Sequence, residues 1–131
     1  MNEGRIKFEQ RVSKYSLDVV KFYSGLDKNP QVQVLGKQLL RSGTSVGANI
    51  FEARAASSKR DFINFYHHAL KSANESCFWL KLITESGLVK NGLLDILSQE
   101  SQELANILGA SIRTMKAKSQ KINWINGLFL N

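Results

Sequence analysis

The sequence predicts an all-α protein, an antiparallel up-down four-helix bundle, and three observations favour this fold class. Apolar residues recur at three- and four-residue spacing over four segments, about 8–24, 31–56, 59–86 and 92–118. Short stretches with Gly, Asn, Pro or Ser separate these segments, as is typical of helix ends. No alternating run of β-branched residues bounded by turns indicates a strand. The 131 residues, 43% of them hydrophobic, suit one domain with its own core.

The first predicted helix, 8–24, has a single apolar face. Its members stand at four- and three-residue steps: Phe8, Val12, Tyr15, Val19 and Phe22. Gly25 then supplies a left-handed stop. Asn29 can cap the next helix, and Pro30 can occupy its first position without losing a needed donor. A second helix is therefore expected to begin near residue 31.

The second segment contains "RSGTSVGANIFEARAASS", which is rich in small residues and has two interpretations. A phosphate-binding loop needs Gly, four residues and then Gly-Lys-Ser/Thr after a strand, and "GTSVGANI" has neither the lysine nor the strand. The helical period instead continues through Gly43 and Gly47, each of which costs a helix about 1 kcal/mol relative to alanine. We therefore expect a neighbouring helix to approach closely at these glycines.

The third predicted helix, 59–86, has a recognisable start and end. Ser58 with Asp61 three residues later resembles a capping box, and Gly87 stands where a C-terminal cap is expected. Its broad apolar face comprises Phe62, Phe65, Tyr66, Ala69, Ala73, Ser76, Leu80 and Ile83. This face predicts extensive packing on the other helices.

The fourth predicted helix, 92–118, is followed by an apolar tail, 122–131, with the sequence "INWINGLFLN". A segment this hydrophobic needs a covering surface. Two alternatives remain open, docking on its own bundle and docking on a neighbouring subunit.

A polar stripe runs beside the apolar stripe of the second helix. Because its neighbours are small, we expect a partly buried hydrogen-bond network that fixes the register of the second and third helices. The predicted members are Arg41, Asn49, Glu52, Ser72 and Glu75.

Composition limits the cellular setting. The one cysteine, Cys77, cannot form an internal disulfide, and the N-terminal stretch lacks the apolar core of a signal peptide. We therefore expect a cytoplasmic protein. No apolar run approaches the roughly 20 residues that span a bilayer, which argues against an integral membrane protein.

Signals for catalysis or metal binding are weak. No Glu is followed three residues later by His, as a di-iron bundle requires, and His67 and His68 are adjacent, about 100° apart on a helix. We therefore expect no enzymatic activity, no metal and no cofactor. The enzyme alternative would use Glu52, Glu75 or His68 and predicts strongly perturbed titration in a cleft.

Charge gives the best functional signal. The net charge is +7, which favours polyanionic partners such as RNA or DNA. One basic cluster lies at the turn after the second helix, and another follows Glu103, the last acidic residue. The candidate phosphate contacts are Arg54, Lys59, Arg60, Lys116 and Lys118. The alternative for any one of them is a solvated basic surface.

Residues 39–83, "LLRSGTSVGANIFEARAASSKRDFINFYHHALKSANESCFWLKLI", closely resemble the four-helix-bundle family of proteins encoded within intervening sequences of bacterial 23S ribosomal RNA genes. The residues that carry the resemblance are Arg41, Asn49, Ile50, Glu52, Phe62, Phe65, Ser72 and Glu75. The family resemblance implies a homopentameric ring with a basic surface for nucleic acid and no enzymatic activity. Phe51 and Ala53, where the family often has Ala and Gly, and the tail depart from its pattern.

The leading hypothesis from the sequence is an oligomeric bundle that binds RNA or another nucleic acid. Accessory proteins of diversity-generating retroelements are similar in fold and bind a reverse transcriptase and RNA. They suggest the alternative, an oligomeric adaptor whose partner is a protein, with apolar anchors such as Trp79 or Trp124 in place of lysines.

Overall fold

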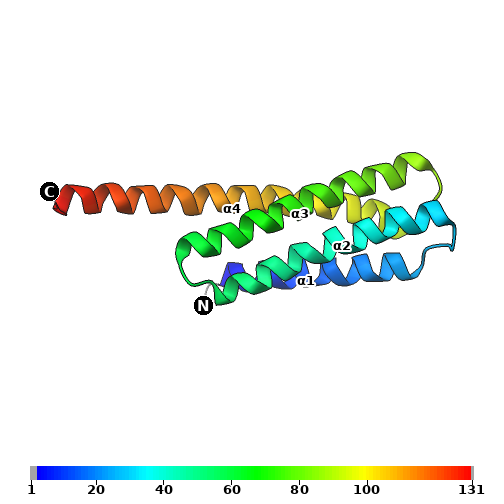
Figure 1. Ribbon diagram of the computed structural model, residues 1–131, viewed down its shortest axis with the longest axis horizontal. Coiled ribbons are helices and arrows are strands. Elements are labelled where there is room, and N and C mark those ends of the chain that lie inside the picture. Colours follow the sequence, from blue (N-terminus) through cyan, green and yellow to red (C-terminus); the bar gives the residue numbers. More distant parts are fainter. Residues whose placement is uncertain (1–2, 131) are drawn as a thin grey trace.

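The computed structural model describes residues 3–130, with side chains up to residue 128, and contains four long helices (Figure 1). They are α1 (Glu3–Ser24), α2 (Pro30–Glu52), α3 (Lys59–Ser86) and α4 (Gly92–Leu130), and a short 3-10 helix η1 (Ala53–Ala55) follows α2. The all-α four-helix bundle predicted from the sequence is confirmed.

Local side-chain chemistry sets the helix ends. The Asn29 side chain accepts hydrogen bonds from the first-turn backbone N–H groups of α2, with Pro30 in the first position. Ser58 Oγ accepts from the Asp61 N–H at 3.0 Å, and the Asp61 carboxylate accepts from the backbone of the preceding turn. Gly87 has φ of 68°, the left-handed conformation that ends α3. These three predicted caps are confirmed. The left-handed stop predicted at Gly25 is wrong, because among the described residues the left-handed glycine is Gly87, and the Gly25 N–H bonds the Lys21 and Phe22 carbonyls of the last turn of α1.

Helices that are neighbours in sequence are neighbours in the bundle. α2 packs on α1 and α3, and α4 packs on α3 and α1, which closes the ring of four. The largest fully buried side chains come from every helix and include Tyr15, Phe22, Leu39, Leu80, Ile83, Leu97, Leu104 and Leu108. Within residues 3–130, no helix has both the length and the apolar character needed to cross a membrane.

The glycines of α2 lie against α1. A Cβ atom added at Gly43 would lie 3.0 Å from both methyl carbons of Val19, and one at Gly47 would lie 2.7 Å from Ser16 Oγ. Such contacts are closer than van der Waals packing allows, so only glycine fits without a shift of its neighbours. The close helix approach predicted from the small residues is confirmed.

A buried set of hydroxyl groups links the helices in pairs. Tyr15 Oη of α1 lies 2.5 Å from Ser101 Oγ of α4, and Ser42 Oγ of α2 lies 2.9 Å from Ser76 Oγ of α3. Burial raises the pKa of Tyr15, and hydrogen bonds with Ser101 and Ser76 oppose that rise. Because Tyr15 of the first pair also interacts with Ser76 of the second, the hydroxyl groups connect all four helices.

The predicted polar network forms only in part, because not all of its side chains contact the neighbouring helix. The Arg41 guanidinium pairs with the Glu75 carboxylate, which also accepts a hydrogen bond of 2.8 Å from the Trp79 indole. Asn49 donates to a backbone carbonyl of its own helix, and Glu52 is exposed.

Ser72 takes part through its backbone carbonyl, which accepts from Ser76 Oγ at 2.8 Å. Among the described side chains of the predicted set, Arg41 and Glu75 therefore form the contact that joins α2 to α3.

The apolar tail is a continuation of α4. The helix runs on past the predicted end at residue 118, and Figure 1 shows it extending beyond the other three helices. We call residues 119–130 the α4 extension. Ile122, Trp124 and Leu128 are 51%, 68% and 60% exposed, so the extension does not fold back onto its own bundle over the described side chains. Docking on a neighbouring subunit stays a prediction.

Candidate nucleic-acid interface

A groove between the start of α3 and the second half of α4 brings the two basic clusters together. Lys59 and Arg60 line one side and Lys116 lines the other, around a volume of about 480 Å³. Ile63, Ser119, Gln120, Ile122 and Asn123 complete the lining. We call this the α3–α4 groove.

Three features make the α3–α4 groove electropositive. Its described lining holds three cationic side chains and no carboxylate. The first turn of α3, a helix of 28 residues, contributes the positive end of its dipole. The nearby Asp61 carboxylate is turned to the backbone N–H and hydroxyl of Ser57. An anion in the groove would therefore meet donors and positive charge from two helices.

The positive surface continues along α3 to His67. This half-buried imidazole has a pKa below its usual value of 6.5, because of burial first and then of the positive charges of Lys116 and Lys71, with a contribution from His68. The effect of Lys116 on the pKa of His67 arises because Lys116 of α4 lies close to α3. Sequence reasoning treated the two histidines as a failed metal site and missed this role.

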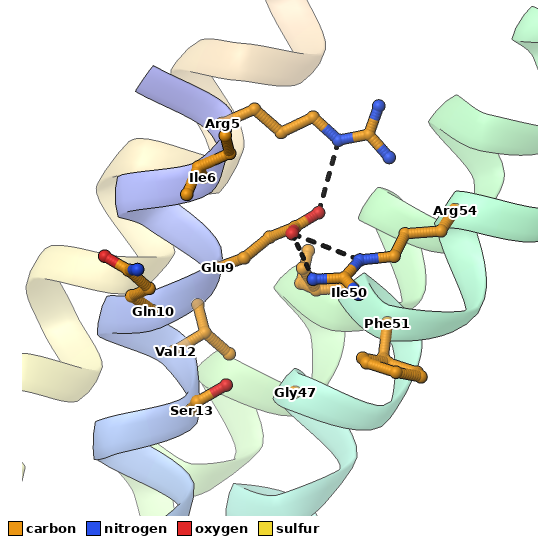
Figure 2. Close-up of a pocket in the computed structure, with 10 residues that line it drawn as sticks. All are labelled: Arg5, Ile6, Glu9, Gln10, Val12, Ser13, Gly47, Ile50, Phe51 and Arg54. Atoms are coloured by element: carbon orange, nitrogen blue, oxygen red, sulfur yellow. Dashed lines mark hydrogen bonds and ion pairs between the residues drawn. The ribbon is translucent and has the colours of Figure 1, made fainter. Parts of the chain in front are cut away.

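Arg54 lies at a different place from the other predicted contacts. Its guanidinium binds the Glu9 carboxylate, with Nε 3.1 Å from Oε2, and stacks on the Phe51 ring at 4.5 Å from the ring centroid. Figure 2 shows Glu9 of α1 held between Arg5 and Arg54, at the edge of a second hollow of about 720 Å³ between α1 and α2. The charge of Arg54 is thus already partnered within the chain.

Glu9 is a structural anion. Hydrogen bonding to Arg54 lowers its pKa, burial opposes the shift, and Arg5 adds to the lowering. A general acid or base at neutral pH needs a carboxyl pKa shifted in the other direction. The Glu9–Arg54 pair instead ties the start of α1 to the turn after α2.

The three residues named for the enzyme alternative do not lie together in one cleft. Glu52 and His68 are exposed, and Glu75 is engaged by Arg41 and Trp79. Over the described part of the chain, no three His, Cys, Asp or Glu side chains lie close enough to hold a metal ion. The α3–α4 groove is the hollow whose chemistry best suits a ligand.

Lys118 points away from the α3–α4 groove. It follows Lys116 by two residues, which turns its side chain by about 200° around the helix axis. Its side chain is exposed and is absent from the groove lining. Of the five predicted contacts, the structure thus brings Lys59, Arg60 and Lys116 together and leaves Arg54 and Lys118 outside.

Comparison with known proteins supports the same fold. A sequence profile described as "23S rRNA-intervening sequence protein" matches residues 5–110. A crystal structure of a protein of unknown function from the S23 ribosomal protein family of Bacteroides thetaiotaomicron shares 34% identity, with a TM-score of 0.75, over 83% of this chain and 97% of that one. The search of curated proteins finds no match. Since the profile covers most of its length, the chain belongs to the 23S rRNA-intervening sequence protein family.

Proposed function

We propose that this chain is a non-enzymatic, cytoplasmic and homo-oligomeric bundle protein that binds nucleic acid, RNA in the first place, in the α3–α4 groove. One observation carries the proposal. The α3–α4 groove combines Lys59 and Arg60 with Lys116, which stands much later in the sequence. Its described lining has no acidic side chain.

The chemistry of this groove fits phosphate groups. Long cationic side chains and a helix N-terminus bind phosphate oxygens and release counterions, with little dependence on base sequence. The apolar side chains of Ile63 and Ile122 give the lysine stems a dry surface to lie on. The expected ligand is therefore the backbone of a structured nucleic acid.

Self-association belongs to this proposal. The family resemblance implies a ring of five chains, which would present several α3–α4 grooves to one nucleic acid. Joined binding sites raise the overall affinity by making each later contact intramolecular. A weak single groove therefore suffices for firm binding by the assembly.

The test is binding of an RNA hairpin and a duplex DNA, measured by fluorescence anisotropy over a salt series. The triple variant Lys59→Gln, Arg60→Gln, Lys116→Gln is compared with Lys21→Gln, Lys28→Gln, Lys37→Gln, which loses the same charge near the other end of the bundle, where these lysines are exposed.

Removal of the groove cations should weaken binding and reduce the log–log salt slope by about 0.7–0.9 for each lost phosphate contact. The control triple should keep most of the slope. Equal losses in both triples would show non-specific attraction by net charge and would overturn the groove assignment. Arg54→Gln and Lys118→Gln should each have a smaller effect than Lys116→Gln.

A protein-binding adaptor is the second candidate, with a partner such as a reverse transcriptase. The exposure of Trp124 and Leu128 favours it, because large apolar side chains are typical anchors of protein interfaces. Such binding would survive high salt and would be weakened by Trp124→Ala and Leu128→Ala, which lie outside the groove lining. Groove-bound RNA would instead be released by salt and would tolerate both variants.

A further inference from the structure

One side of the last turns of α4 combines lysines with large apolar side chains. At 3.6 residues per turn, five residues fall within about 120° of one another around the helix axis. They are Lys118, Lys121, Trp124, Ile125 and Leu128. All five side chains are exposed or half-buried, and Trp124 and Leu128 are 68% and 60% exposed. We call this set the lysine–apolar face.

The lysine–apolar face lies away from the α3–α4 groove. The groove takes Ser119, Gln120 and Asn123 from α4, and these three residues stand on the other side of the helix axis. A nucleic acid in the groove would therefore leave the lysine–apolar face in water. This placement also accounts for Lys118, which the groove does not use.

The two lysines of this face carry charges that the chain itself leaves unpaired. The ion pairs within the described residues engage Arg5, Arg11, Lys14, Arg41 and Arg54, and neither Lys118 nor Lys121 takes part in one. No acidic residue follows Glu103 in the sequence. An anionic surface that approaches the α4 extension would thus meet two available cations and no carboxylate of this segment.

The apolar members of the face have no cover within the chain. Figure 1 shows the α4 extension projecting past the other three helices, so Trp124 and Leu128 lie beyond the end of the bundle. Exposed apolar side chains that lie side by side indicate an interaction surface.

The mixture of residues indicates which kind of surface covers the face. Lysine is depleted from protein–protein interfaces, yet two lysines stand in line with Ile125 and Leu128. A lipid surface suits this mixture, because a lysine stem lies along apolar material while its ammonium group stays among the headgroups. Tryptophan is enriched at the same boundary between water and lipid.

We propose that the lysine–apolar face attaches this chain to an anionic lipid surface. The lysines come first along α4 and the apolar side chains follow, so an extension that enters obliquely leaves the lysines at the level of the headgroups. Lys121 and Leu128 stand about 10 Å apart along the helix axis. This length matches the depth of roughly 5–10 Å to which amphipathic helices enter a bilayer.

Surface attachment needs no membrane-spanning segment. None of the helices described over residues 3–130 could cross a bilayer, whereas a helix that lies in the surface needs only one apolar face. Attachment is also available to a single chain and to a ring. A homo-oligomer would present several α4 extensions to one membrane, which strengthens binding by making each later contact intramolecular.

The test is flotation of the full chain with lipid vesicles. One set contains two parts phosphatidylcholine and one part phosphatidylserine, and the other contains phosphatidylcholine alone. The chain should bind the mixed vesicles and bind the neutral ones much more weakly. The pair Trp124→Ala, Leu128→Ala should lower the partition coefficient at least about tenfold. The pair Lys118→Gln, Lys121→Gln should lower it about fivefold for each lysine lost.

Two matched pairs serve as controls. Val34→Ala with Ile96→Ala removes exposed apolar side chains from the bundle itself, and Lys28→Gln with Lys37→Gln removes two exposed lysines near its other end. Both pairs should bind the mixed vesicles nearly as well as the wild type. Thermal unfolding should stay the same in the variants of Trp124 and Leu128, because both side chains lie beyond the bundle.

Tryptophan fluorescence follows insertion directly. The emission of Trp124, obtained as the difference between the wild type and Trp124→Phe, should move to shorter wavelength when mixed vesicles are added, because the indole leaves water. Emission that is already shifted without vesicles and does not respond to them would mean that a second copy covers the face, and would overturn the proposal.

Binding that depends on phosphatidylserine and is lost in both test pairs but kept in both control pairs supports the proposal. Absence of binding to the mixed vesicles would overturn it and leave the face to a protein partner. Losses of equal size in the test and control pairs would show attraction by the whole protein and would overturn the assignment to the lysine–apolar face.

Discussion

Gly43 of α2 lies directly against Val19 of α1, where a Cβ atom would come within 3.0 Å of both valine methyl carbons. Val19 is fully buried and β-branched, so it has no free rotamer into which it can retreat. The absence of a side chain at residue 43 therefore sets how closely the two helices approach.

Gly43→Ala should destabilise the protein even though alanine favours a helix. The gain of about 1 kcal/mol in helix propensity is opposed by an overpacking cost of about 1–3 kcal/mol. Val19→Ala removes both crowded methyl groups, so the double variant should be more stable than the sum of the single effects. Urea unfolding of the four proteins of the cycle measures this coupling.

Gly109→Ala is the matched control for this cycle. It also lies within a helix, and the nearest atom that its Cβ would meet is the flexible end of Arg113 at 3.4 Å. This variant should gain about 0.5–1 kcal/mol. An equal gain for Gly43→Ala would contradict the close packing against Val19.

Tyr15→Phe should destabilise the bundle by about 1–2 kcal/mol, because Ser101 would lose its partner in a buried site. Tyr23→Phe is the control, since the Tyr23 hydroxyl bonds Gln33 at 3.2 Å in a partly exposed position and should cost less. In the double variant Tyr15→Phe, Ser101→Ala, the loss should be smaller than the sum of the single losses. Additive losses would mean that the two hydroxyl groups are not coupled.

Stability should fall in acid through Glu9. Its pKa in the folded protein is held below 4.5 by Arg54, against the opposing effect of burial, while in the unfolded chain it returns towards that value. The ionised carboxylate therefore stabilises the fold above about pH 4.5, and this contribution is lost as the pH falls through the lower folded pKa.

Glu9→Gln should accordingly reduce stability at neutral pH and flatten the acid side of the stability curve. Chemical unfolding between pH 3 and pH 7 measures both effects. Glu52→Gln removes a carboxylate from an exposed position of the same region and controls for the change in net charge. A curve for Glu9→Gln that is parallel to the wild type would rule out the Glu9–Arg54 pair as the cause.

The pKa of His67 should rise when Lys116 is replaced by glutamine. Burial and the charge of Lys116 both hold this pKa below 6.5, and the variant removes the second cause. Lys118→Gln, with its side chain on the other side of α4, should leave it nearly unchanged. NMR titration of the imidazole protons distinguishes the two, and equal shifts would contradict the placement of Lys116 beside α3.

The fold was largely predictable because its signals are local. Helix ends are marked by residues that act on the nearby backbone, namely Asn29, Pro30, Ser58 and Gly87. The glycines of α2 would destabilise a helix unless close packing compensated, so they predict a close contact with another helix. The start of α1 at Glu3 was missed because its first turn gains a partner only in space, where Arg5 lies over the Phe62 ring of α3.

The candidate site was predictable only in part, because it depends on how helices face one another. Sequence identified both basic clusters, but it cannot place Lys116 opposite Lys59 without the register of α3 against α4. The same limit explains the polar network, where the buried hydroxyl groups of Tyr15 and Ser101 were overlooked in favour of the charged pair at the surface. A polar side chain that hydrogen-bonds to a side chain on another helix leaves no periodic pattern in the sequence.

The length of α4 also determines which of its backbone amide hydrogens exchange quickly with solvent. Helices of fewer than about 12–15 residues are marginal in water without tertiary contacts, and the α4 extension has none from its own bundle along the exposed side of Trp124 and Leu128. Its amide hydrogens should therefore exchange quickly in dilute protein and slowly once a surface covers them, while those around Leu104 stay protected throughout. Deuterium uptake along this one helix thus separates the stability of the bundle from the occupancy of its extension.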